Sequence, residues 1–158
     1  PYNGADLAEY DLDLRPPLEA QLMDAVDAIA YNVADLDDGF EARLLDVDML
    51  RDELPAFAAT YAAVERSHPQ ARNQLKFNEA IKRILDRLAT DLIEHTRAQV
   101  LASGAGNLDE IRRASRRFAG FSPEAAQLNA ALKRFLYQRL YDNPLIVEDR
   151  EPADLVAI

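Results

Sequence analysis

The stretch LEAQLMDAVDAIAYNVADLDDG, at positions 18–39, decides the fold of this chain. Its larger apolar residues recur at steps of three, four or seven. The series includes the first residue after the stretch, Phe40, and consists of Leu22, Val26, Ile29, Val33 and Phe40. Such spacing lines one side of an α-helix, because one turn takes about 3.6 residues. Pro17 suits a helix start, since its missing N–H is not needed in the first turn. We therefore expect a helix over 18–38, ended by Gly39.

The same periodicity continues through the rest of the chain and predicts further helices. We expect them at 41–53, 55–67, about 70–102, 107–117 and 123–143, with irregular segments at 1–17 and 145–158. Three residues mark helix ends by their chemistry: Gly104 after the longest helix, and Asn107 and Ser122 as N-caps. No strand pattern competes, so the sequence predicts an all-α fold, a bundle of about five or six helices in one domain over 1–158.

The apolar stripes of the later helices predict the core. The residues expected to point inward are Phe57, Tyr61, Val64, Phe77, Ile81, Ile84, Leu88, Leu92, Leu128, Leu132, Phe135 and Leu136. They recur at helical spacing within their segments, as the buried side of an amphipathic helix does.

Composition narrows the classes of function. The chain has 158 residues, a formal net charge of −10 and no cysteine. The negative charge argues against nucleic acid as the main partner, because duplex binding needs many Lys and Arg side chains against the phosphates. The lack of cysteine removes disulfides, thiolate catalysis and Cys-based zinc sites, and it fits a cytoplasmic protein. No apolar run approaches the roughly 20 residues that span a bilayer.

Acidic residues gather on the side of the first helix that faces away from its apolar seam. At 100° per residue, five side chains fall within an arc of about 80°: Asp24, Asp27, Tyr31, Asp35 and Asp38. One interpretation is a polar face turned to water. However, like charges three or four residues apart cost helix stability, and no Lys or Arg stands between Arg15 and Arg43 to relieve them. The alternative is therefore a site for a cation, with a tyrosine suited to a ring or a hydroxyl-bearing ligand.

Basic residues form two short runs, at 112–117 and 133–139. They are either solvated helix faces or a subunit contact or phosphate-binding edge.

Several of these residues, taken together, resemble a known family. Glu19-Ala-Gln21, then Asp27-Ala-Ile-Ala-Tyr31-Asn, then Asp35-Leu-Asp-Asp-Gly39 is similar, without a gap, to the deoxynucleoside triphosphate triphosphohydrolases, dGTPase-like enzymes of the HD superfamily. The run at 131–144, ALKRFLYQRLYDNP, resembles the end of these enzymes. The resemblance implies an all-helical enzyme of the HD-domain type, of which this chain is the C-terminal part.

The resemblance also implies a reaction and roles for three residues. These enzymes hydrolyse dGTP or another dNTP to the deoxynucleoside and triphosphate, with a divalent metal, Mg²⁺ or Mn²⁺, held by a His, a His-Asp pair and a distal Asp. By position, Asp27 is that distal metal ligand, Tyr31 packs against the deoxyribose, and Asp35 accepts a hydrogen bond from the sugar 3′-hydroxyl. No general acid, general base or nucleophile is assigned to this chain.

Departures from the family pattern define the alternative. Ala28 stands where the family commonly has Glu, Ala34 where it has His, and Glu41 where it has Arg. The chain also lacks a His-Asp pair, and we expect those metal ligands to precede Pro1 in a longer protein. We therefore expect the chain alone to be inert and not to bind metal tightly. The alternative is a non-catalytic helical module for oligomerisation or regulation.

Partners follow from the same resemblance. The expected substrate of the longer protein is a dNTP, and a homo-oligomer is expected because the family often forms hexamers.

Overall fold

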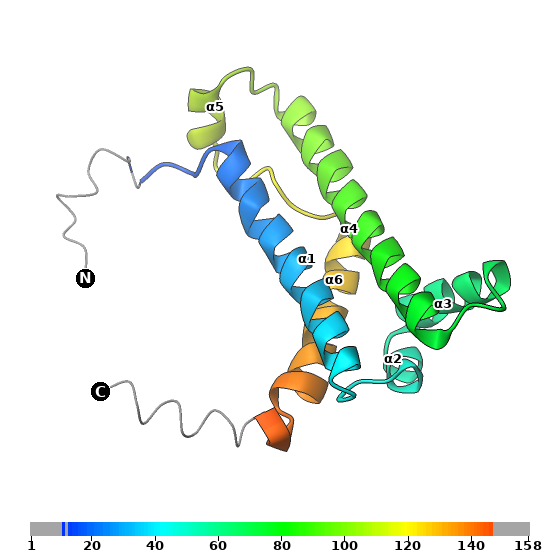
Figure 1. Cartoon of the computed structure of the whole chain (residues 1–158). Coiled ribbons are helices and arrows are strands. Elements are labelled where there is room, and N and C mark those ends of the chain that lie inside the picture. The colour runs from blue at the N-terminus through cyan, green and yellow to red at the C-terminus, as the bar shows by residue number, and fades with distance from the viewer. Residues whose placement is uncertain (1–10, 12, 147–158) are drawn as a thin grey trace, which may run out of the picture.

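Every regular element in the described part of the chain is a helix. A computed structural model describes residue 11 and residues 13–146, so most of the predicted irregular segments at 1–17 and 145–158 lies outside the described residues. The elements, in order, are α1 (Leu18–Glu41), α2 (Val47–Glu53), α3 (Pro55–Ser67), α4 (Asn73–Ser103), α5 (Leu108–Arg112), α6 (Pro123–Leu136) and the π-helical turn η2 (Tyr137–Tyr141) (Figure 1). The all-α prediction is confirmed. No helix in this part of the chain is both long and apolar enough to cross a membrane.

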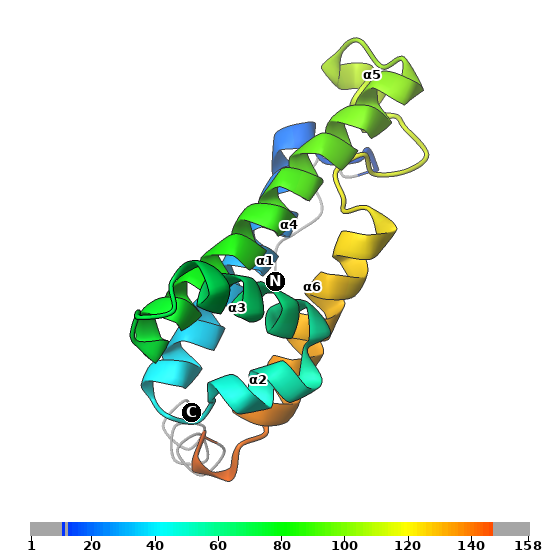
Figure 2. The same ribbon diagram turned by 90° about the vertical axis from the view of Figure 1, so that its right-hand side faces the viewer.

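The two long helices, α1 and α4, run side by side in opposite directions, and α6 packs against the pair (Figures 1 and 2). The short helices α2 and α3 lie at the end where α1 finishes and α4 begins (Figure 2). There the rings of Phe40 and Phe77 stack with centroids 3.9 Å apart, and Phe57 packs against Phe77 at 6.1 Å. These aromatic contacts join α1, α3 and α4 into one apolar core.

The predicted core of α3, α4 and α6 is confirmed, because all twelve residues expected to point inward are buried. The predicted seam of α1 is only partly right. Ile29 is buried, but Val26 is 47% exposed, and the buried face includes Leu36 and Asn32. The reason is that α1 packs against α4 on one side and α6 on the other, so its buried face is turned toward α6.

Several helix ends lie where the sequence predicted them. Gly104 follows α4 in the left-handed conformation, at a φ of 72°. The Asn107 side chain accepts a hydrogen bond from the Glu110 backbone N–H at 3.0 Å, and Ser122 Oγ accepts one from Ala125 at 3.3 Å. Short polar side chains at these positions satisfy N–H groups that have no partner within the helix.

Other boundaries differ from the prediction. The segment predicted as a helix over 41–53 is helical only from Val47, because the Asp46 carboxylate accepts from the Met49 N–H and starts α2 there. The residues before it form a turn in which Arg43 has a φ of 59°. The long helix covers 73–103 rather than 70–102, and the last α-helix ends at Leu136, with one π-helical turn to Tyr141 instead of an α-helix to 143.

Arg15 and Gln21 hold the chain after Arg112, where the short helix predicted over 107–117 ends: Arg15 donates to the carbonyls of Arg112 and Ser115. Gln21 is 2% exposed, and its Nε2 donates to the Pro16 carbonyl at 2.8 Å. Its Oε1 accepts from the backbone N–H groups of Phe118 and Ala119, at 2.9 and 3.3 Å. The chain after α5 therefore bonds to α1. These hydrogen bonds replace those that further helical turns would form.

Gly39 lies inside α1 and does not end it, which corrects the predicted helix stop. A Cβ atom there would lie 2.7 Å from Leu45 Cδ1 and 3.2 Å from Leu140 Cδ1. Leu45 is 2% exposed and cannot move into solvent easily. A glycine is needed here because the side chains of Leu45, in the turn after α1, and Leu140, in η2, both pack against its backbone.

We expect Gly39→Val to lower the free energy of unfolding by about 2 kcal/mol, because it overpacks a filled region of the core. Gly120→Val is the matched control, since a Cβ at Gly120 meets no atom within 4 Å. Chemical denaturation followed by circular dichroism measures both. Equal stability of the two variants would contradict the close approach at Gly39.

Candidate functional site

The three predicted site residues lie in line on the outer side of α1. Asp27, Tyr31 and Asp35 are four residues apart, which places successive side chains about 6 Å apart along the helix axis. Asp27 is exposed and Tyr31 is 62% exposed, whereas Asp35 is half-buried. The stripe therefore starts in solvent at Asp27 and reaches the packed side of α1 at Asp35.

Asp35 has a partner that the sequence did not predict. The Tyr141 hydroxyl donates a hydrogen bond to Asp35 Oδ2 and so joins η2 to α1. A hydrogen bond to an ionised carboxylate is stronger than one between neutral groups. The bond orients one carboxylate oxygen toward the protein and leaves the other oxygen to accept from a ligand.

A basic and aromatic column continues from Tyr141 along α6. The Tyr137 and Tyr141 rings meet edge to face, with centroids 5.0 Å apart at 86°. The Lys133 ammonium lies 6.0 Å from the centre of the Tyr137 ring. Lys133 and Tyr137 are exposed. We call Lys133 at the end of α6, together with Tyr137 and Tyr141 of η2, the α6 column: a surface beside α1 with a cation, two rings and two hydroxyls.

Side-chain amides hold α1 against α6 close to this column. Asn32 Nδ2 donates to Asn129 Oδ1 at 2.8 Å, and Asn32 is 7% exposed. A buried amide pair is specific, because a slipped helix would leave both groups without partners. This pair therefore fixes the position of α6 along α1.

The acidic stripe is partly neutralised by a distant residue, contrary to the prediction that its charges are unrelieved. Arg117 Nη1 lies 2.7 Å from Asp24 Oδ2. Gln21 holds the backbone of the next residue, Phe118, against α1 and so places Arg117 there. An exposed ion pair of this kind stabilises the fold little, but it puts a cation one turn before Asp27.

The described residues do not form a metal site. Within 13–146 and residue 11, no group of three or more His, Cys, Asp or Glu side chains could hold a metal ion. Asp27 could supply one carboxylate oxygen. Hydrolytic metal sites use several protein ligands, so the other ligands of such a metal would have to come from outside this part of the chain.

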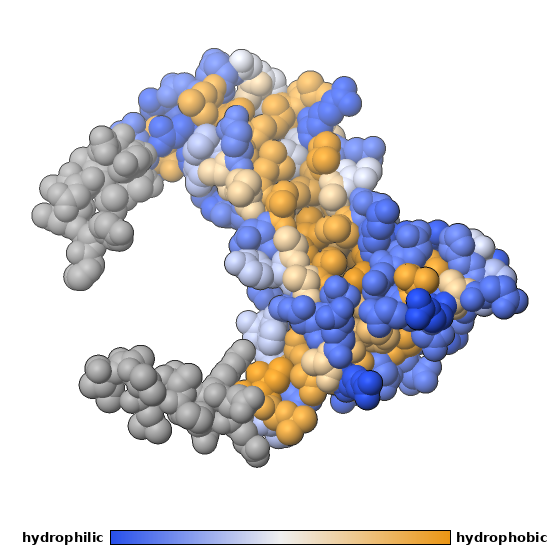
Figure 3. Space-filling model, viewed as in Figure 1, coloured by the Kyte–Doolittle hydropathy of each residue, from blue (hydrophilic) through white to orange (hydrophobic). Residues whose placement is uncertain are grey.

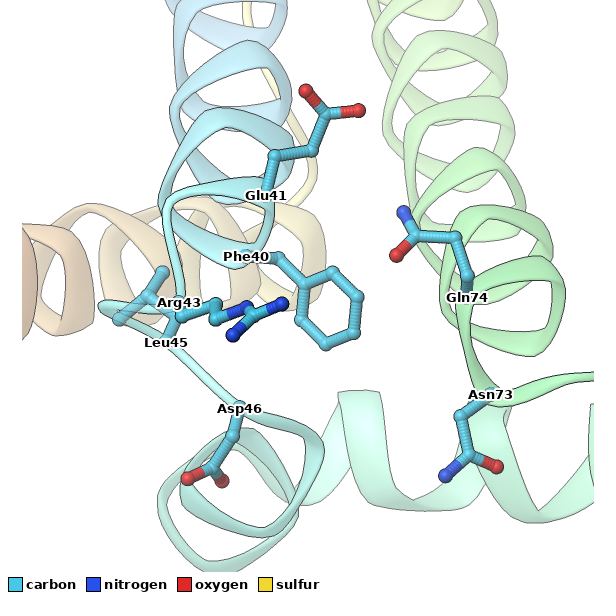
Figure 4. Close-up of a pocket in the computed structure, with 7 residues that line it drawn as sticks. All are labelled: Phe40, Glu41, Arg43, Leu45, Asp46, Asn73 and Gln74. Carbon is cyan, nitrogen blue, oxygen red and sulfur yellow. The ribbon is translucent and has the colours of Figure 1, made fainter.

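A pocket of about 680 Å³ lies away from the stripe, where α1 ends and α2 and α4 begin (Figure 4). Its walls carry Phe40, Glu41, Arg43, Leu45, Asp46, Asn73 and Gln74. The Asp46 carboxylate caps α2. The wall mixes both charges, and none of the predicted site residues lines it.

The sequence analysis noted Lys133 as part of a basic run, but it missed the two tyrosines that lie beside it on the same side of the helix. A signal was present: Lys133, Tyr137 and Tyr141 follow one another at steps of four, beside the buried Leu132, Leu136 and Leu140. That spacing puts the three on one side of a helix, but only the tertiary structure shows that this side borders Asp35.

We expect Tyr141→Phe to lower the free energy of unfolding by about 1–2 kcal/mol, because Asp35 then loses a charge-assisted hydrogen bond. Tyr137→Phe is the matched control: it also removes only a hydroxyl, from an exposed ring in the same turn, and should change stability by less than about 0.5 kcal/mol. Urea denaturation measures both. The bond between η2 and α1 is refuted if the two variants unfold at the same urea concentration.

Comparison with known proteins shows which proteins the chain is similar to. No protein-family model matches the chain. Proteins named deoxyguanosinetriphosphate triphosphohydrolase-like protein are similar to it: one from Thiobacillus denitrificans is 39% identical over 127 residues, 80% of this chain and 33% of that protein. Those from Bordetella pertussis and Geobacter sulfurreducens are 35% and 31% identical over 84% and 88% of this chain, and 34% and 36% of their own lengths. The chain spans about a third of the length of these relatives. Most of this chain is therefore homologous to one part, about a third, of each of these proteins named deoxyguanosinetriphosphate triphosphohydrolase-like.

Proposed function

We propose that this chain is the C-terminal part of a metal-dependent enzyme of the HD superfamily that hydrolyses dGTP or another dNTP to the deoxynucleoside and triphosphate. The observation that carries the proposal is the stripe of Asp27, Tyr31 and Asp35 on one side of α1, with Asp35 bonded to Tyr141. The names of the relatives, at 31–39% identity, support the same reaction.

The sugar contacts have a physical basis in the contrast between Tyr31 and Asp35. Tyr31 presents an exposed ring that can pack against the apolar side of a deoxyribose. One turn on, the half-buried Asp35 carboxylate can accept a hydrogen bond from the 3′-hydroxyl while Tyr141 holds its other oxygen. A ring and an oriented acceptor together read the shape of the sugar and its hydroxyl.

The phosphates would lie toward Asp27, because the 5′ oxygen that carries them is on the other side of the sugar from the 3′-hydroxyl, which Asp35 would bind. Asp27 is two helical turns before Asp35 on the same side of α1. In the proposed reaction, water attacks the α-phosphorus, and the bond from that phosphorus to the 5′ oxygen breaks. The 5′ oxygen leaves with a proton as the deoxynucleoside hydroxyl, and the three phosphates leave together as triphosphate.

Asp27 is proposed as one ligand of Mg²⁺ or Mn²⁺ in the longer protein. Because the described residues form no metal shell, the remaining ligands must come from residues outside them. The chain alone is therefore proposed to be inert and not to hold a metal tightly. The longer protein is proposed to be a cytoplasmic homo-oligomer.

The alternative function is a non-catalytic helical module for oligomerisation or regulation. Ala28, Ala34 and Glu41, which depart from the family pattern, favour it. Ala28 and Ala34 are exposed beside Asp27 and Asp35, so these two departures fall on the proposed site itself. The following measurements separate the two functions.

We expect the product of the complete open reading frame to release triphosphate from dGTP with Mg²⁺ or Mn²⁺, and Asp27→Ala to reduce the rate by at least about 100-fold, because the metal loses a direct ligand. Asp38→Ala removes an exposed carboxylate from the same side of α1 and should leave the rate unchanged. The 158-residue chain alone should release none. An active protein whose rate survives Asp27→Ala would refute the role of Asp27, and an inactive complete protein would favour the non-catalytic module.

Asp35 can be tested through the substrate. The intact protein should prefer dGTP over 2′,3′-dideoxyGTP by about 100-fold in kcat/KM, because the analogue leaves the carboxylate without its hydroxyl partner. We expect Asp35→Ala to reduce this preference to less than about tenfold, chiefly by slowing dGTP hydrolysis. Asp38→Ala should keep the preference. A preference that Asp35→Ala leaves intact would assign the 3′-hydroxyl to another residue.

A further inference from the structure

A cation from outside α1 lies on the stripe, one turn before the proposed metal ligand. Arg117 Nη1 is 2.7 Å from Asp24 Oδ2, and Asp24 precedes Asp27 by three residues. Along the helix, Asp24 points within about 20° of both Tyr31 and Asp35. Arg117 therefore belongs to the same face of α1 as the residues proposed to bind the nucleotide.

The loop that carries Arg117 is bonded to the beginning of α1 and the chain just before it. On one side of Arg117, Arg15 Nη2 donates to the Ser115 carbonyl at 2.9 Å. On the other side, the buried Gln21 accepts from the Phe118 N–H at 2.9 Å. Figure 1 shows this loop after α5, beside the start of α1. The backbone at Arg117 is thus held by contacts in which its own side chain takes no part.

The Arg117 guanidinium has donors left for a ligand. The Arg117 side chain is 49% exposed and that of Asp24 is 63% exposed. A guanidinium has five N–H donors in a planar fork, and among the described residues its one acidic partner is Asp24. In the view of Figure 1, hydrophilic residues cover this corner of the molecule, whereas apolar residues gather along the seam between α1 and α4 (Figure 3). A charged ligand can therefore reach the guanidinium from solvent.

The proposed reaction needs a cation at this place. Its substrate and its product both carry a triphosphate, yet α1 itself contains no Lys or Arg. The helix instead presents the carboxylates of Asp24, Asp27 and Asp38 to solvent. These like charges would repel a polyanion unless cations lie between them. Arginine suits this task, because its fork can donate two parallel hydrogen bonds to one phosphate group.

The groups along α1 follow the order of the parts of a nucleotide. In the proposed function, Asp35 would bind the 3′-hydroxyl, Tyr31 the sugar, and Asp27 the metal beside the α-phosphate. Asp27 lies about 12 Å before Asp35 along the helix axis, and Asp24 lies about 4.5 Å further in the same direction. The phosphates that continue beyond the α-phosphate would then come to Arg117.

We propose that Arg117 binds the β- and γ-phosphates of the substrate. This inference rests on the proposed function, because the direction of the nucleotide follows from the roles of Asp27 and Asp35. Arg117 forms and breaks no covalent bond in the reaction. Its fork holds the terminal phosphates while water attacks the α-phosphorus, and it stabilises the charge of the triphosphate product. The competing role is a purely structural one, in which Arg117 only pairs with Asp24.

Substitutions of two neighbouring arginines separate these roles. Arg117→Ala removes the guanidinium from the stripe, and Arg117→Lys keeps the charge but loses the fork. Arg116→Ala is the matched control, because Arg116 is also exposed but lines a cavity with Ser103 and Gly104 at the end of α4. Each variant is made in the product of the complete open reading frame, and circular dichroism checks that its helices are kept. The measurements are dGTP hydrolysis with Mg²⁺ or Mn²⁺, and binding of inorganic tripolyphosphate by titration calorimetry with the same metal.

We expect Arg117→Ala to lower kcat/KM for dGTP by about 10–100-fold and to weaken tripolyphosphate binding at least about tenfold, because charge-assisted hydrogen bonds to phosphate are lost. Arg117→Lys should recover part of each loss. Arg116→Ala should change either quantity by less than about twofold. The preference for dGTP over 2′,3′-dideoxyGTP should survive Arg117→Ala, because it depends on Asp35 at the other end of the stripe.

The proposal is overturned if Arg117→Ala leaves tripolyphosphate binding unchanged, if both alanine variants lose it equally, or if the unsubstituted protein binds none. A changed preference between dGTP and 2′,3′-dideoxyGTP would also overturn it, since the substitution would then distort the whole site. An active protein unaffected by Arg117→Ala keeps the proposed function without this inference. A protein that hydrolyses no dNTP, yet loses tripolyphosphate binding through Arg117→Ala alone, rejects the proposed function and keeps the phosphate site.

Discussion

The close approach of the α1 backbone to its neighbours at Gly39 is the constraint on which the site depends. Leu45 and Leu140 occupy the space that a side chain at Gly39 would need. Because Leu140 can lie against α1, the next residue, Tyr141, reaches the carboxylate of Asp35 one turn before the glycine. A larger residue would push η2 away from α1 and separate this pair. The glycine thus acts through packing, and the hydrogen bond at the proposed sugar site follows from it.

Buried polar contacts, more than apolar periodicity, decide how α1 is rotated in the bundle. Gln21 at one end and Asn32 in the middle each have a partner far away in sequence, in the chain after α5 and in α6. Leaving such groups without partners would cost more than exposing Val26 does, since an unpaired buried amide loses its hydrogen bonds to water. This rotation half-buries Asp35 while Asp27 stays in solvent.

The two ends of the stripe therefore suit different chemistry. Asp35 is oriented by Tyr141 and belongs to a surface that is complete within this chain, with the rings and the lysine of the α6 column beside it. Asp27 is exposed, and the described residues around it form no group of three or more metal ligands. In the function we propose, one end reads the sugar with groups already in place, and the other waits for ligands from a further segment.

The sequence alone determined the helices, their apolar cores and the alignment of Asp27, Tyr31 and Asp35, because these depend on spacing within one helix. Caps at Asn107 and Ser122 were equally readable, since a cap bonds only to residues three positions on. The tertiary structure alone decided the exposure of Val26, the role of Gly39 and the partners Arg117 for Asp24 and Tyr141 for Asp35. Each of these joins residues from different elements of the fold, and helical periodicity says nothing about which faces of two helices meet.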